Sequence, residues 1–174
     1  MKKIILSMAL FSALLSCKKS NSGSSSGYHF TATIDGANHA FNTSPLATKV
    51  GNAGYTLLGV DGFTTQAGET FAVSIDNTPS GKPIVAGTYT DTTSDFDVSF
   101  VYVVNSSTQY VGGTNETQMA VGAGVTVQNH VKIVITSIDG TSIKGTFSGD
   151  GFLNADVTGA KKTVTNGDFY AKFQ

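Results

Sequence analysis

The chain has 174 residues, of which 40% are hydrophobic and 13% are charged, and its formal net charge is −1. All eleven basic residues are lysines, so the chain lacks arginine, the residue that most often reads nucleic acids, and it has no excess of positive charge. We therefore expect no nucleic-acid partner. Twenty glycines, 10% aromatic residues and a low net charge are typical of a β-rich globular protein rather than a disordered chain.

The first residues have the pattern of an export signal. Lys2 and Lys3 precede an apolar run at residues 4–15, and a small residue then comes before Cys17, the only cysteine. A positive start, an apolar stretch and a small residue are typical of a secretory signal peptide, here residues 1–16. The apolar run is too short for a membrane-spanning helix, which needs about 20 residues.

The tetrapeptide Leu-Leu-Ser-Cys at positions 14–17 resembles the lipobox of bacterial lipoproteins. This resemblance implies that the signal is removed before Cys17 and that Cys17 carries acyl chains. Two or three acyl chains anchor a protein firmly in a membrane, whereas one chain binds only reversibly. The alternative is an ordinary signal peptide with an incidental cysteine.

Residues 17–27 follow as a predicted tether of Lys, Ser, Asn and Gly. Such a segment is flexible, and about ten residues span roughly 17 Å on average, so the folded body would lie close to the bilayer. Lys18 follows the cysteine directly, which by the usual sorting rule of lipoproteins favours the outer membrane. No acidic stretch of the kind associated with surface export follows Cys17, so we expect the periplasmic side rather than the cell surface.

From residue 28 onward, apolar and polar residues alternate in short runs that are interrupted by Gly, Asn, Asp and Pro. This period of two predicts β-strands, and no stretch shows the sustained period of a helix. Many short, closely spaced strands predict one all-β domain, 28–174, with an antiparallel β-sandwich fold; a barrel-like closure of the sandwich remains an alternative. The expected strands are 28–34, 37–42, 54–61, 69–76, 84–90, 96–104, 109–113, 118–127, 130–138, 142–149 and 165–173.

Two hairpins can be given a register. Asp35 and Gly36 predict a two-residue type I′ turn, because both central residues of that turn need positive φ. This turn places inward-facing residues opposite one another. The expected pairs are Ile34 with Ala37, Ala32 with His39 and Phe30 with Phe41.

The second hairpin contains Asp139 and Gly140. A two-residue turn here would place polar residues opposite apolar ones, so we expect a three-residue loop, 138–140, with Gly140 in the left-handed conformation of a bulge. The expected pairs are Ile135 with Ile143, Ile133 with Gly145 and Val131 with Phe147.

Four short segments carry a family resemblance. They are Phe-Thr-Ala-Thr-Ile-Asp-Gly at 30–36, Gly-Thr-Tyr at 87–89, Ile-Lys-Gly-Thr-Phe at 143–147 and Asn-Gly-Asp-Phe at 166–169. Together they resemble families of small Bacteroidota lipoproteins of unknown function, whose members often have Trp where this chain has His39. The resemblance implies a β-sandwich in the cell envelope and transfers no catalytic or binding residue.

Three histidines are the only side chains that normally titrate near neutral pH. The alternation predicts that His29 and His130 face solvent and that His39 points inward between aromatic residues. No spacing typical of a catalytic triad or a zinc site surrounds them. We therefore expect a protein that is not an enzyme and that has no cofactor.

Asp91, Asp95 and Asp97 form the densest acidic cluster. Carboxylates and nearby hydroxyls suit Ca²⁺, which prefers oxygen ligands, so these three residues are candidate calcium ligands. The spacing is not that of a known calcium loop. The favoured interpretation is a solvated loop at the start of a strand.

The predicted function is that of an outer-membrane-anchored, non-catalytic interaction or structural module of the cell envelope. Its partner is an envelope protein or a glycan that the sequence does not identify. A glycan-binding accessory lipoprotein is the alternative, and a hydrolase comes third. Sugars are usually bound by aromatic faces, and in the absence of Trp the candidate ligand contacts are His39, Tyr110 and Tyr170.

Overall fold

The computed structural model describes residues 27–50, 57–64 and 68–174 of the chain. The expected signal peptide 1–16, Cys17 with the tether up to residue 26, and residues 54–56 of an expected strand lie outside the described residues. In the described part, no helix is both long and apolar enough to span a membrane.

The described residues form eleven strands and one helix, so the chain is all-β as expected. In chain order the elements are β1 (His29–Ile34), β2 (Ala37–Ala40), β3 (Thr43–Val50), β4 (Leu57–Phe63), β5 (Thr70–Asp76), β6 (Gly87–Thr90), β7 (Asp97–Asn105), β8 (Thr108–Gly113), α1 (Thr114–Gly122), β9 (Lys132–Ile138), β10 (Ser142–Leu153) and β11 (Lys161–Phe173).

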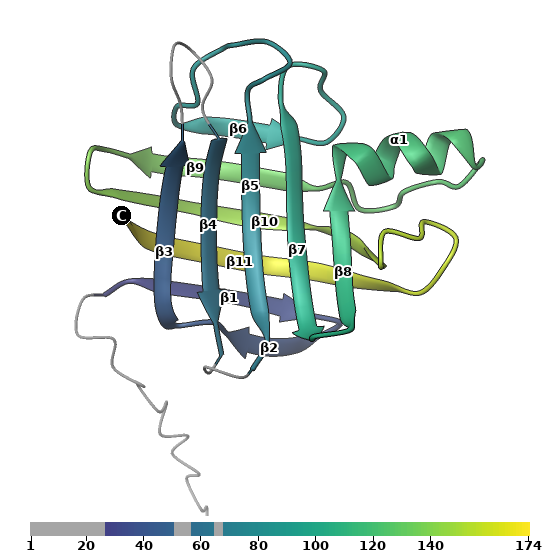
Figure 1. Ribbon diagram of the computed structural model, residues 1–174, viewed down its shortest axis with the longest axis horizontal. Helices are drawn as coiled ribbons and strands as arrows, with labels where there is room; N and C mark the ends of the chain where they lie inside the picture. The colour runs from purple at the N-terminus through teal and green to yellow at the C-terminus, as the bar shows by residue number, and fades with distance from the viewer. Residues whose placement is uncertain (1–26, 51–56, 65–67) are drawn as a thin grey trace, which may run out of the picture.

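The strands make two layers that run crosswise over one another (Figure 1). One layer has the order β3-β4-β5-β7-β8, and the other has the order β2-β1-β11-β10-β9-β6. All pairings within each layer are antiparallel. The structure therefore confirms the antiparallel β-sandwich.

The two layers are joined by hydrogen-bonded ladders at two corners. At one corner, the end of β11 pairs in parallel with β3 through Lys172–Leu46 and Phe173–Ala47. At the other, the end of β10 pairs with β8 through Phe152–Val111 and Leu153–Tyr110. The long strands β10 and β11 thus belong mainly to one layer and reach the other at their ends.

The core lies between the layers because strand alternation places apolar side chains on the two inner faces. Its centre is a group of phenylalanines contributed by both layers: the Phe30 ring lies 5.2 Å from Phe147 and 5.7 Å from Phe71, between ring centroids. Phe30 and Phe71 are fully buried. Contacts between aromatic rings from opposite layers add to the burial of apolar area that stabilises the sandwich.

The first hairpin has the predicted register. Ile34 pairs with Ala37 and Ala32 pairs with His39. Asp35 and Gly36 have φ values of 48° and 84°, as a type I′ turn requires.

The predicted register of the second hairpin is wrong. Ile138 pairs with Ile143, so the loop has four residues, and Gly145 pairs with Ile135 after a shift in register. The Asp139 carboxylate accepts hydrogen bonds from the backbone N–H groups of Thr141 and Ser142, which stabilises this longer loop. Gly140 does not have positive φ, so it is not the expected left-handed residue.

The predicted strand 118–127 is also wrong, because most of it lies in or directly after the helix α1. Ala120 is the fully buried apolar residue of this helix, and it packs with Phe152 and Val157 near the β10–β11 connection. Ala120 contacts residues more than 30 positions away in the sequence. The local pattern around Met119 and Val121, which resembles strand alternation, does not contain this information. Both of those side chains are exposed.

A further strand, β3, has no counterpart among the predicted strands. It contains Pro45, which lacks an N–H group, and Ser44 before it has a φ of 51°. These irregularities interrupt the alternation that would have indicated a strand.

Candidate functional site

A polar, hollowed surface covers the outer side of the layer that contains β9, β10, β11, β1 and β2. We call it the polar face. Among the described residues, hollows of about 450 Å³ and 390 Å³ lie on this face, and Asn166 lines both of them. The first hollow is lined by Lys132, Val134, Thr146, Phe147, Ser148, Asn166, Gly167 and Asp168. The second is lined by Thr31, Ala32, Thr33, Asn38, His39, Ala40 and Asn166.

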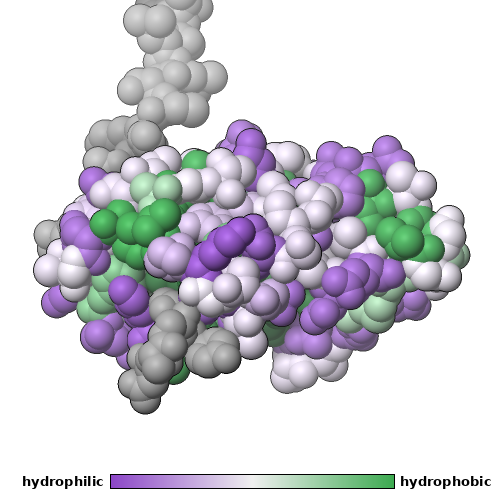
Figure 2. Space-filling view, turned by 90° about the horizontal axis from the view of Figure 1, so that it is seen from above, coloured by the Kyte–Doolittle hydropathy of each residue, from purple (hydrophilic) through white to green (hydrophobic). Residues whose placement is uncertain are grey.

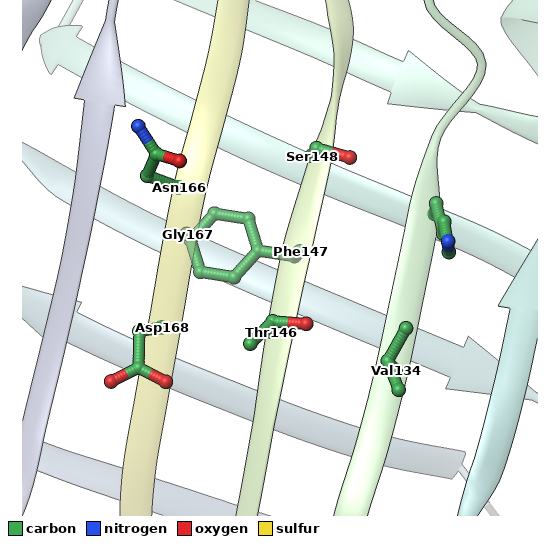
Figure 3. A pocket seen from close by; sticks show the side chains of 8 residues that line it. Val134, Thr146, Phe147, Ser148, Asn166, Gly167 and Asp168 are labelled. Atoms are coloured by element: carbon green, nitrogen blue, oxygen red, sulfur yellow. The ribbon is translucent and has the colours of Figure 1, made fainter.

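The first hollow crosses three neighbouring strands. Figure 3 shows Asn166 and Asp168 on β11 beside Thr146 and Ser148 on β10, with Val134 on β9. Strand alternation places these polar side chains on the side of the layer opposite the buried Phe147 and Phe169. The polar face is therefore built on strands inside a sheet, not on loops.

A β-bulge lies where the two hollows meet. Asn166 pairs with neither β1 nor β10, although every other residue of β11 pairs with a neighbouring strand. Its φ of 49° is in the left-handed region, which Asn tolerates better than most residues. Gly167 follows, and a Cβ there would lie 2.5 Å from the Phe147 carbonyl oxygen, so a larger residue does not fit. Bulges of this kind often lie next to functional sites.

The centre of the polar face carries hydrogen-bonding groups that are free within the described part of the protein. The side chains of Thr146, Ser148 and Asn166 make no hydrogen bond to any residue in the ranges 27–50, 57–64 and 68–174. By contrast, the buried Asp150 side chain accepts hydrogen bonds from Asn129, Lys161 and Thr163. The free groups on the polar face are available to a ligand.

An aromatic corner borders the polar face. We use this name for Tyr28, His29, Lys144 and Tyr170. The rings of Tyr28 and Tyr170 lie 4.5 Å apart, and Lys144 Nζ lies 4.3 Å from the centre of the Tyr170 ring. His29 Nε2 lies 2.6 Å from the Asp168 carboxylate, which lines the first hollow. The aromatic corner is thus connected directly to the polar groups of the hollow.

The candidate ligand contact His39 lies at the margin of the second hollow, but its imidazole is directed away from the outer surface. His39 pairs with the inward-facing Ala32, and its ring stacks on Phe41. Its Nδ1 donates a hydrogen bond of 2.8 Å to Glu69, which also accepts one from the hydroxyl of Tyr102. Burial tends to raise the pKa of Glu69, but these two hydrogen bonds outweigh it and hold this pKa below its usual range.

The two candidate tyrosines lie in different layers. Tyr170 belongs to the aromatic corner, whereas Tyr110 lies in β8 and packs on Tyr102, with a ring separation of 6.2 Å. The structure therefore does not bring them together in one sugar-binding surface.

The three candidate calcium ligands also have separate environments. The side chain of Asp91 is almost fully buried, which corrects the expectation of a solvated loop, and it accepts hydrogen bonds from His130, Thr117 and the backbone of Val131. Asp95 pairs with the exposed Lys82. Asp97 is exposed at the start of β7. Within the described ranges, no group of three His, Cys, Asp or Glu residues is arranged to hold a metal ion.

Large exposed apolar side chains lie outside the polar face. The large ones among the described residues are Val50, Leu57, Val85, Met119 and Val121. Figure 2 shows apolar areas at opposite ends of the upper surface, one of them over α1, with polar side chains between them. Single exposed apolar side chains of this kind are normal on protein surfaces and do not define a binding site.

Sequence reasoning missed Asn166 as a site residue. The signal was present, because Asn-Gly inside an alternating run marks a turn or a bulge. The predicted strand over 165–173 is uninterrupted and so does not use the Asn-Gly signal. No protein-family model, curated protein or solved structure matches the chain, so the assignment of a site rests on its own geometry.

Proposed function

We propose that the protein is a lipid-anchored, non-catalytic binding module of the bacterial outer membrane, which holds its ligand on the polar face. The observation that carries this proposal is the meeting of two hollows at Asn166, a residue that the bulge in β11 leaves out of both neighbouring ladders. The lipobox resemblance at Cys17 and the resemblance to small Bacteroidota lipoproteins support the location in the envelope.

We assign no catalytic role to the three histidines. Each histidine lies beside a carboxylate: His29 beside Asp168, His39 beside Glu69 and His130 beside Asp91. Within the described part of the chain, no histidine is hydrogen-bonded to a Ser or Thr hydroxyl, the nucleophile that such a pair would activate.

The point where the tether joins the body supports a binding role near the membrane. The body begins beside the aromatic corner, where Tyr28 packs on Tyr170. The tether predicted from the sequence would span roughly 17 Å on average between Cys17 and the start of the body, so we place the border of the polar face near the membrane. We infer the periplasmic side from the sequence around Cys17 and not from this distance.

Membrane attachment is tested by fractionation. The substitution Cys17→Ala removes the site of acylation, so we expect the protein to move from the detergent phase into the soluble fraction, because acyl chains supply the binding energy. Retention of the variant in membranes after a high-salt wash would contradict the lipid anchor.

Use of the polar face is tested by photo-crosslinking in living cells. A photoreactive residue replaces Thr146 on the polar face in one variant and Ser106, in the turn between β7 and β8, in the control. Both positions are exposed. We expect covalent adducts with envelope components from position 146 and few from position 106. Equal labelling at the two positions, or none at 146, would refute the polar face as the binding surface.

A further inference from the structure

We infer that the ligand of the polar face is an uncharged carbohydrate chain that lies along β11, from the aromatic corner to Asn166. This inference rests on the proposed function and adds the chemical class of the ligand. Four features of the described residues support it: charge, hydrogen-bonding capacity, aromatic surface and length.

The charge of the polar face fits an uncharged ligand. The carboxylate of Asp168 lies in the first hollow, but His29 is bound to it, and Lys132 lies at the edge of the hollow on β9. The residues between them, Thr146 and Asn166, are uncharged. A second cation, Lys144, lies in the aromatic corner. In the register of β10, Asp168 lies between the positions of Lys144 and Lys132, which are about 13 Å apart. Among the described residues, the surface therefore has no run of like charges that would be complementary to a polyanion or a polycation.

The hydrogen-bonding groups fit a ligand rich in hydroxyls. The hydroxyls of Thr146 and Ser148 and the amide of Asn166 each donate and accept, as sugar hydroxyls do. A peptide that binds by β-strand addition uses its backbone, and this mode needs an open strand edge, which β2 and β6 offer in this layer. Strands β10 and β11 are paired on both sides, so their side chains, rather than their backbones, face a ligand.

The aromatic corner supplies the apolar surface on which a sugar ring packs. The Tyr28 and Tyr170 rings pack on one another, with centroids 4.5 Å apart and planes tilted by 58°, and both residues are half-buried. Aromatic rings with a polar tip suit a ligand with one apolar and one hydroxylated side. Lys144 Nζ covers one face of the Tyr170 ring, so the sugar would pack on the Tyr28 ring, with the Lys144 ammonium group beside it as a hydrogen-bond donor for hydroxyls.

The length of the row indicates a chain rather than a single sugar. Asn166, Asp168 and Tyr170 alternate outward along β11, and alternate residues of a strand lie about 7 Å apart. The row therefore spans roughly 14 Å, and the second hollow continues from Asn166 across β1 and β2. Several linked sugar rings are needed to contact the whole surface.

The test measures binding of the full-length protein, purified in detergent from a host that processes lipoproteins. The probes are an array of uncharged glucans, mannans, galactans and xylans, with anionic polysaccharides beside them, followed by calorimetric titration of the strongest binder. We expect binding to uncharged chains that strengthens with chain length. Tyr170→Ala should weaken the affinity at least tenfold, whereas Tyr170→Phe should retain most of it.

A matched pair of asparagines provides the control. Asn166→Gly removes the amide from the polar face, and Asn154→Gly removes one from the β10–β11 connection. Both positions have φ near 50°, which glycine adopts freely, so both variants should fold. We expect a several-fold loss of affinity for Asn166→Gly and none for Asn154→Gly.

The outcomes separate this inference from the proposed function. If no uncharged glycan binds, or if Asn166→Gly and Asn154→Gly behave alike, the carbohydrate inference is overturned. If photo-crosslinking at position 146 still gives adducts in that case, the proposed binding function holds and the ligand belongs to another chemical class. If position 146 gives no adducts either, the proposed function fails as well.

Discussion

The Asp91 carboxylate lies 3.0 Å from Nδ1 of His130, a residue 39 positions further along the chain. The same carboxylate accepts hydrogen bonds from Thr117 on α1 and from the backbone N–H of Val131. One nearly buried side chain therefore connects the end of β6, the helix and the segment that enters β9. Its role is to hold three elements that are distant in sequence.

We expect Asp91→Ala to lower the free energy of unfolding by about 3 kcal/mol, because it leaves the buried N–H of Val131 and the partly buried hydroxyl of Thr117 without an acceptor. The matched control is Asp95→Ala, which removes an exposed pair with Lys82 and should cost less than about 1 kcal/mol. Urea unfolding measures both values. Similar losses in the two variants would show that Asp91 does not stabilise the contact of α1 with β9.

The same aspartates give a prediction for calcium. Asp91 and Asp95 already have partners in separate environments, so excess Ca²⁺ should leave the melting temperature unchanged relative to EDTA. The measurement is a thermal melt of the wild type and of Asp95→Asn. A calcium-specific rise in the wild type that is lost in Asp95→Asn would refute this expectation.

The two glutamates of the chain should respond to pH in opposite directions. Burial raises the pKa of Glu116, and the negative charge of Asp91 raises it further. The pKa of Glu69 is lowered despite its burial, by hydrogen bonds from Tyr102 and His39. Glu116 therefore favours folding in its neutral form, whereas Glu69 favours folding in its ionised form.

For Glu116, the favourable contribution is complete below the unfolded-state pKa, about 4.3, and is lost as the pH rises through the higher folded-state pKa. Glu116→Gln stays neutral, so we expect it to melt a few degrees above the wild type at pH 7 and close to it at pH 4. A variant that is less stable than the wild type at pH 7 would contradict this account of Glu116.

For Glu69, the favourable contribution is present above pH 4.3 and is lost as the pH falls through the lower folded-state pKa. Glu69→Gln should therefore melt below the wild type at pH 7, and the difference should shrink in acid. Melts of both variants across this pH range serve as mutual controls. Parallel curves for the two variants would refute the opposite pKa shifts.

The Asp-Gly dipeptides at 35–36 and 139–140 both lie in hairpin loops, so they allow a comparison of turn geometry. Gly36 has a φ of 84°, whereas Gly140 is outside the left-handed region and a Cβ there meets no atom within 4 Å. We expect Gly36→Ala to lower the free energy of unfolding by about 1 kcal/mol and Gly140→Ala to change it little. Equal effects in urea unfolding would show that the type I′ geometry does not contribute to stability.

This comparison shows which parts of the fold local sequence determines. The Asp35-Gly36 turn was predicted correctly because its register depends on adjacent residues and a two-residue loop. The Asp139-Gly140 loop was not, because the Asp139 carboxylate binds the backbone at Thr141 and Ser142 and so favours a four-residue loop. Both loops contain the same dipeptide but differ in length. The longer loop is stabilised by side-chain hydrogen bonds of Asp139, which cannot be read from the alternation of apolar and polar residues.

Contacts between distant residues explain what else the sequence did not predict. Helix α1 packs through Ala120 against Phe152 and Val157. Asp91 is buried and accepts hydrogen bonds from His130 and Val131. The polar face also depends on contacts between distant residues, because β1, near the start of the domain, pairs with β11, near its end, and β11 pairs with β10. The Asn-Gly at 166–167 was the one local signal for its position.

The last strand gives a test of the whole architecture. Deletion of residues 169–174 should prevent cooperative folding, because β11 pairs with β10 and β1 and reaches β3 at its end. Phe169 and Ala171 are almost completely buried.

Burying one Phe side chain contributes about 2–3 kcal/mol, and this deletion also removes ladder hydrogen bonds to three strands, so the loss is comparable to the whole stability of a small domain. Deletion of Gln174 alone is the control and should leave the urea transition nearly unchanged, since only its backbone bond to Ala47 is lost. A cooperative transition in the longer deletion, with the slope of the wild type, would mean that the sandwich folds without the C-terminal part of β11.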